Sequence, residues 1–138
     1  MKTIRVFAVA VLLFACAWAV NAAAMKLVPS EFVVKPGSIR WWRFDVESTA
    51  LIIGRFRAQG GVGHDIEAIV AEWDECENWI NRNDANVLYT SGKVTNGKVR
   101  VSIGERGSYC IAFSNRTAVV SAKEIVADIA LYKSGAIQ

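Results

Sequence analysis

Short runs in which apolar and polar residues alternate recur along the chain, and turn residues separate them. In residues 39–46, Trp42 and Phe44 share one face while Trp41 and Arg43 share the other. A period of two is the pattern of a β-strand with one buried face. About eight such segments occur, and no long amphipathic helix interrupts them. The chain is therefore predicted to be all-β, an antiparallel β-sandwich of jelly-roll type.

The other predicted strands follow the same rule, with an apolar face set against a polar one. Residues 74–84 break the alternation, because they are polar and compatible with a short helical turn. The further strands are predicted over residues 49–58, 65–73, 86–94, 98–103, 108–115 and 123–133.

Two dipeptides predict specific turns. Pro36 followed by Gly37 is the order that a type II turn requires, since its third residue needs a positive φ. Asn96 followed by Gly97 stands between two alternating runs. That arrangement is typical of a two-residue type I′ β-hairpin.

The N-terminus has the form of a secretory signal peptide. Two early cations precede an apolar run over residues 7–20, and small residues follow as far as Ala24. We expect residues 1–24 to be the signal, with cleavage after Ala22 or Ala24, and residues 25–138 to form a single domain. The alternatives are an uncleaved N-terminal anchor and a lipoprotein cleaved before Cys16.

Charge and hydropathy exclude two classes of partner. The chain has 16 basic and 13 acidic residues, and the signal would remove Lys2 and Arg5. The mature chain is then nearly balanced in charge, so nothing favours nucleic acid. We expect no membrane span in the mature chain, because no second apolar segment is long enough.

The cysteines predict a disulfide. Cys16 would leave with the signal, so that Cys76 and Cys110 remain as an even pair. Disulfides persist in oxidising compartments, which is where a secreted chain resides. The alternative is two separate thiols.

Residues 107–131 resemble the C-terminal signature of GOLD (Golgi dynamics) domains. That signature has a glycine, a strand led by tyrosine, an asparagine, small polar residues, a lysine and a last apolar strand. The resemblance implies a β-sandwich that recognises proteins or lipid-linked partners without catalysis, often in cargo transport. The matching positions are Gly107, Tyr109, Phe113, Asn115, Ser121 and Lys123.

Catalytic and metal-binding arrangements are weakly supported. Cys110 could act as a nucleophile with His64 as its base, and Asp65 or Glu67 could orient the ring. However, Cys110 lies within a strand, where no helix N-terminus lowers its pKa. The acidic residues 72–78 do not follow the spacing of an EF-hand, so a solvated loop is the simpler interpretation. We expect no enzyme activity, no metal and no cofactor.

Aromatic and basic side chains supply the candidate contacts. Trp41 points away from the face of Trp42, and Trp79 lies in a polar segment, so each could contact a protein partner or stack on a sugar. The alternative is that they cover the ends of the sandwich. Arg55 and Arg57 share an outward face and would join Lys98 and Arg100 in a basic stripe if their strands are neighbours; an ordinary solvated face is the alternative.

Asn115 begins the glycosylation sequon Asn115-Arg116-Thr117. We expect it to remain unmodified and to shape the turn that follows its strand, because asparagine hydrogen-bonds nearby backbone groups.

These observations together predict a module secreted to the bacterial periplasm or the exterior, with a recognition or structural role. Its partner is expected to be an unknown protein or a glycan, and we expect the module to bind this partner without catalysing a reaction. The alternative is a small carbohydrate-binding or peptidase-associated β-sandwich.

Overall fold

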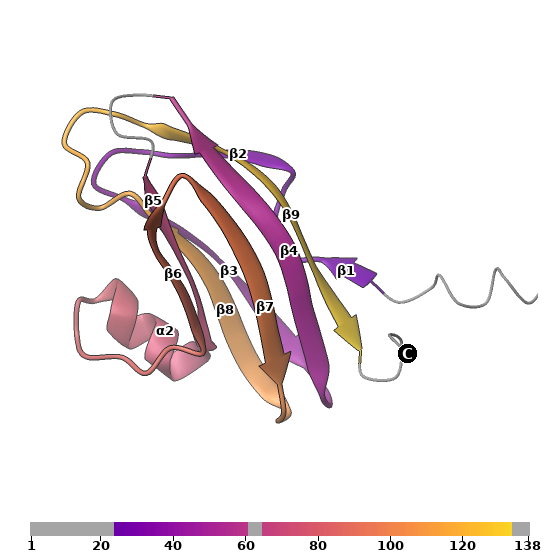
Figure 1. Ribbon diagram of the computed structural model, residues 1–138. Coiled ribbons are helices and arrows are strands. Elements are labelled where there is room, and N and C mark those ends of the chain that lie inside the picture. The colour runs from indigo at the N-terminus through magenta and orange to yellow at the C-terminus, as the bar shows by residue number, and fades with distance from the viewer. Residues whose placement is uncertain (1–23, 61–64, 134–138) are drawn as a thin grey trace, which may run out of the picture.

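Two antiparallel sheets pack face to face in the computed structural model, which describes residues 24–60 and 65–133 (Figure 1). Most of the predicted signal peptide lies outside the described residues. The first sheet contains β1 (Ala24–Lys26), β2 (Glu31–Val34), β4 (Ala50–Gln59), β7 (Asn96–Ile103) and β9 (Lys123–Lys133). The second sheet contains β3 (Ile39–Val46), β5 (Ile66–Glu72), β6 (Tyr89–Val94) and β8 (Gly107–Ser114).

The strand order is that of a jelly roll. In the first sheet β9 lies between β2 and β4, β1 also pairs with β9, and β7 follows β4. In the second sheet the order is β3, β8, β5, β6. Apart from β5 and β6, consecutive strands from β2 onward lie in opposite sheets. The predicted sandwich is confirmed, with nine strands in the described part of the chain.

The core lies between the sheets and consists of the faces that the alternation marks as apolar. Phe113 on β8 is fully buried, and its ring centroid lies 5.0 Å from that of Phe32 and 5.3 Å from that of Phe56. Burying each such side chain contributes about 1.5–3 kcal/mol. Ile52 and Ile129, on the apolar faces of the strands predicted over residues 49–58 and 123–133, are also fully buried. The face assignments for these strands are therefore confirmed.

The predicted type II turn is confirmed. Gly37 has a φ of 73°, and the Ser38 backbone N–H donates to the Lys35 carbonyl oxygen at 3.2 Å. The turn connects β2 of the first sheet to β3 of the second.

The predicted hairpin at Asn96 and Gly97 is wrong. Only Thr95 separates β6 from β7, and the two strands lie in different sheets. Neither Asn96 nor Gly97 has a positive φ, which a type I′ turn requires at both positions. Gly97 instead pairs with Phe56 on β4, and a Cβ at Gly97 would lie 2.1 Å from the Phe56 ring. This glycine therefore makes room for a core ring rather than for a turn.

Among the residues that the structure describes, no helix combines the length and the apolar character needed to cross a membrane.

We predict that Gly97→Ala destabilises the fold by about 1–3 kcal/mol, because the added methyl group must displace the packed Phe56 ring. In a Phe56→Leu background the same substitution should cost less than about 1 kcal/mol, since the smaller side chain leaves space. Urea denaturation of the four chains measures both costs. An equal cost in the two backgrounds would show that the ring contact is not responsible.

Candidate functional site

Helix α2 (Trp73–Ile80) leaves the end of β5 and lies against the outer face of the second sheet (Figure 1). Asp74 and Glu75 in its first turn suit the positive end of the helix dipole. Arg82, just beyond the helix, has a φ of 62°, a left-handed conformation common where helices stop. The short helical turn that the sequence indicates is thus a helix of eight residues.

A second apolar cluster fixes this helix to the sheet. Ile69 and Ala71 of β5 and Cys110 and Ala112 of β8 face outward, yet each is at most 1% exposed. Helix α2 covers them because an apolar outer face would otherwise contact water. Strand β8 is therefore buried on both faces. The partly buried side chains around the cluster are Ile39, Trp73, Trp79, Ile80 and Val87.

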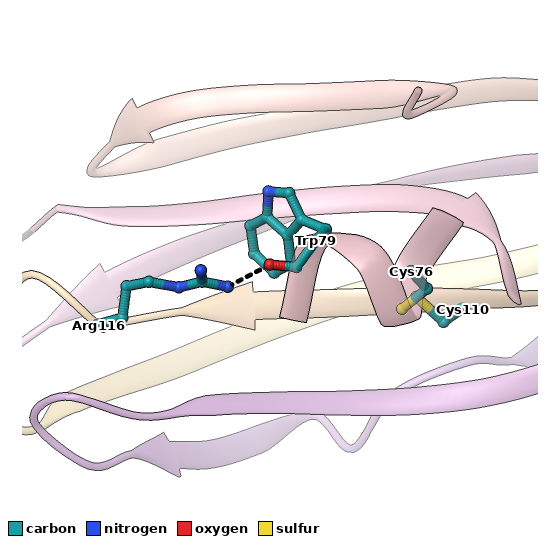
Figure 2. Close-up of a disulfide and its surroundings, with 4 residues drawn as sticks. All are labelled: Cys76, Trp79, Cys110 and Arg116. Carbon is teal, nitrogen blue, oxygen red and sulfur yellow. Dashed lines mark hydrogen bonds between the residues drawn. A yellow bond between two sulfur atoms is a disulfide. The ribbon is translucent and has the colours of Figure 1, made fainter. Parts of the chain in front are cut away.

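Cys76 of the helix and Cys110 of β8 form the predicted disulfide, with 6.3 Å between their Cα atoms (Figure 2). Both residues are fully buried. Cys110 consequently has no free thiol for nucleophilic attack, which removes the predicted alternative of a Cys110 and His64 pair. His64 lies outside the described residues.

Arg116, which follows β8, holds the far end of the helix. Its guanidinium lies 4.7 Å from the Trp79 ring centroid and donates to the Trp79 carbonyl oxygen at 2.9 Å (Figure 2). The last turn of α2 contains no basic residue of its own, so Arg116 supplies the cation that this helix end favours. Burial lowers the pKa of Arg116, and the charge of nearby Arg82 lowers it further. Trp79 therefore has a structural role, since its ring and its carbonyl oxygen both bind Arg116.

Trp41, Arg43 and Trp73 form what we call the aromatic surface. Trp41 of β3 is 45% exposed, and its ring centroid lies 5.1 Å from that of Trp73 at the start of α2. The Arg43 guanidinium lies 4.5 Å from the Trp73 ring centroid. This guanidinium also donates to the Ser108 hydroxyl at 3.2 Å, and that hydroxyl donates to the Asp45 carboxylate. The cation is therefore oriented from both sides.

A hollow of about 360 Å³ adjoins the aromatic surface and has charged walls. Tyr109 at its edge donates its hydroxyl to the Glu105 carbonyl oxygen at 2.7 Å. Burial raises the pKa of Tyr109, and the carboxylates of Glu72 and Glu105 raise it further, so the phenol stays protonated at neutral pH. The remaining lining residues are Arg43, Trp73, Asp74, Arg106, Gly107 and Ser108.

Sequence reasoning identified Trp41 but missed its neighbours. The alternation predicts Trp73 at the end of the strand over residues 65–73, whereas it begins the helix. Arg43 could have been noticed, because it lies two residues from Trp41 on the same outward face. Trp79, the other predicted tryptophan contact, also lies in helix α2, but its ring packs against Arg116 and is not part of the aromatic surface.

Arg55 and Arg57 lie on the opposite side of the sandwich from Trp41. Arg55 pairs with Lys98 of β7, which confirms that the strands of the basic stripe are neighbours. On its other side Arg55 pairs with Asp128 of β9, so cations and an acid share this row. These residues border a shallow hollow of about 670 Å³ on the outer face of the first sheet.

Asn115 is 3% exposed and has the predicted local role. Its side-chain amide donates to the Val34 carbonyl oxygen at 3.1 Å and to the Ser121 carbonyl oxygen at 2.9 Å. A buried amide nitrogen with two partners offers no access to a glycan. The acidic residues 72–78 belong to β5 and α2, and within the described ranges no three metal-binding side chains converge.

No protein-family model and no curated protein matches this chain. The pre-peptidase C-terminal domain of a Bacillus anthracis collagenase is 10% identical, with 73% of this chain and 90% of that chain covered and a TM-score of 0.44. Aeromonas hydrophila PliG, a periplasmic inhibitor of g-type lysozyme, is 10% identical over 81% and 87%, with a TM-score of 0.44. A structure of infectious bursal disease virus Gx strain is 10% identical over 81% and 32%, with a TM-score of 0.37. Likenesses of this size transfer no function.

We predict that reduction of the disulfide lowers the free energy of unfolding by about 2–4 kcal/mol, because the unfolded chain is no longer constrained. Urea denaturation with and without dithiothreitol measures the loss. A Cys76→Ala/Cys110→Ala chain is the matched control, since the reductant should leave its stability unchanged. An equal response of both chains, or none in the natural chain, would contradict the stabilising role of the bond.

Proposed function

We propose that the chain is a secreted, non-catalytic recognition module that binds a protein partner through the aromatic surface of Trp41, Arg43 and Trp73. The observation that carries this proposal is the exposure of Trp41, which is 45% exposed although its ring also packs against that of Trp73. Tryptophan and arginine are the residue types most enriched where partners bind tightly.

The surface is rigid before any partner arrives. Trp73 belongs to a helix that a disulfide joins to the sheet, and Arg43 is oriented by Trp73 and Ser108. A preorganised site loses little side-chain entropy on binding. Burying the exposed half of a tryptophan is worth about 2–3 kcal/mol at roughly 25 cal/mol per Å². Trp41 could thus supply a large share of the affinity of a micromolar complex.

The disulfide supports secretion, since such bonds persist in oxidising compartments. The resemblance of residues 107–131 to GOLD domains also supports a recognition role, because those domains bind partners without catalysis. Tyr109 and Phe113 fill the core, and Asn115 anchors the segment after β8, so three of the matching residues have structural roles. Membership in that family remains a proposal.

Glycan binding is the second candidate, and the hollow beside the aromatic surface favours it. Sugar rings stack on exposed aromatic faces, while Glu72, Asp74 and Arg106 line the adjoining hollow and could bind hydroxyl groups. A glycan would use Trp41 as a stacking platform, so that its binding would change tryptophan fluorescence.

We predict that Trp41→Ala weakens binding to the partner by tenfold or more, because the exposed indole is removed from the contact. The partner is first identified by pull-down from the native envelope, and the affinity of the purified pair is then measured. Leu88→Ala is the matched control, because Leu88 is 48% exposed but directly precedes β6, at the opposite edge of the second sheet from Trp41 on β3. Unchanged affinity in Trp41→Ala would exclude the proposed contact.

The glycan alternative is tested separately. Titration with a panel of polysaccharides should leave tryptophan fluorescence unchanged. A saturable change that disappears in Trp41→Ala would favour the glycan and contradict the protein partner.

A further inference from the structure

The loop between β8 and β9 carries two neighbouring valines almost completely in solvent. Val119 is 89% exposed and Val120 is 87% exposed. The other exposed large hydrophobic residues of the described chain, Met25, Val33, Trp41 and Leu88, are 45–48% exposed. Val119 and Val120 are thus the most exposed of these large hydrophobic residues, and they are adjacent, so that they present one small apolar surface rather than two isolated side chains.

The base of this loop is held firmly. The buried Asn115 amide donates to the Ser121 carbonyl oxygen, so one side chain joins the two ends of residues 115–121. The Asn115 backbone N–H donates to the Ser38 carbonyl oxygen at 2.9 Å, which ties the loop to the turn between β2 and β3. The Ala118 N–H donates back to the Asn115 carbonyl oxygen at 3.2 Å. Figure 1 shows this loop reaching beyond the ends of the strands.

The tip carries no charge. Residues 117–122 contain no acidic or basic side chain, in a chain that is 21% charged. The two flanking cations point elsewhere, because Arg116 is held by Trp79 and Lys123 is only 2% exposed. A projecting, uncharged and apolar tip is complementary to a concave apolar site, where a charge would be costly to desolvate.

We propose that Val119 and Val120 form a hydrophobic tip that inserts into an apolar pocket of a folded protein partner. This rests on the proposed function only in taking the partner to be a protein, and it does not depend on the aromatic surface. Valine suits the role because its stiff side chain loses little rotamer freedom on burial. The hydrogen bonds that hold the two ends of the loop likewise reduce the backbone entropy that is lost on binding.

A lipid surface fits the tip less well. Reversible binding of a single fourteen-carbon acyl chain to membranes is already marginal, and two valines offer far less apolar surface. Neither flanking cation is available to attract anionic headgroups.

The test begins with a photo-crosslinking amino acid at Val119 of the full chain, expressed in its own host. The same amino acid at Ser102, an exposed site on β7, is the control. We expect a crosslinked protein species at Val119 that is absent at Ser102. Equal crosslinking at both sites, or none at Val119, overturns the proposal.

The crosslinked protein is then purified, and its affinity is measured for three chains. Val119→Ser/Val120→Ser should weaken binding at least tenfold, whereas Val119→Ile/Val120→Ile should retain the affinity. Equal affinity of the serine chain and the natural chain overturns the proposal. So does binding to phosphatidylglycerol vesicles that the serine substitutions abolish.

Trp41→Ala measured in the same assay separates the two proposals. If Trp41→Ala weakens binding and the serine chain does not, the aromatic surface stands and the valine tip is wrong. The reverse result supports the tip and removes the aromatic surface.

Discussion

The disulfide between Cys76 and Cys110 joins helix α2 to β8, a strand that is buried on both faces. Without the helix, the outer face of β8 would expose apolar side chains. The bond and the apolar cluster around it therefore turn a two-layer sandwich into a local three-layer structure. The candidate contacts depend on this third layer, because the first residue of α2 supports Trp41 and its last turn holds Arg116.

Helix α2 links the aromatic surface to the valine loop. Its first residue, Trp73, packs against the tilted ring of Trp41 and lies under the Arg43 guanidinium. Near its other end, the Trp79 carbonyl oxygen accepts a hydrogen bond from Arg116. Arg116 is the second residue of the segment 115–121, which carries the two valines. Within residues 24–60 and 65–133, no helix covers the outer face of the first sheet, and cations there pair across the strands with an acid, as Arg55 does with Asp128. The two sides of the sandwich thus differ, with the helix and the aromatic surface on one and a charged sheet on the other.

Much of this fold could be predicted from the sequence, because alternation reports burial directly. Residues 39–46 and 123–133 are strands with the predicted bounds, and the disulfide is predicted from two cysteines in a chain that is expected to be secreted. The hairpin at Asn96 and Gly97 failed because local turn preference gave way to the packing of Phe56 against Gly97. The third layer was missed, although Cys110 and Ala112 between core residues already signal a strand covered on both faces. The exposure of Val119 and Val120 depends on the anchoring by Asn115 and cannot be read from their own identity.

Hydrogen exchange of the native and the reduced protein tests most directly whether the disulfide holds the third layer. We expect the amides of Asn78, Trp79 and Ile80 in α2 to exchange much faster after reduction, because the helix then opens locally. Amides in the middle of β4 and β9, which lie in the other sheet, should keep their protection. Unchanged protection of α2, or an equal loss in α2, β4 and β9, would contradict the account.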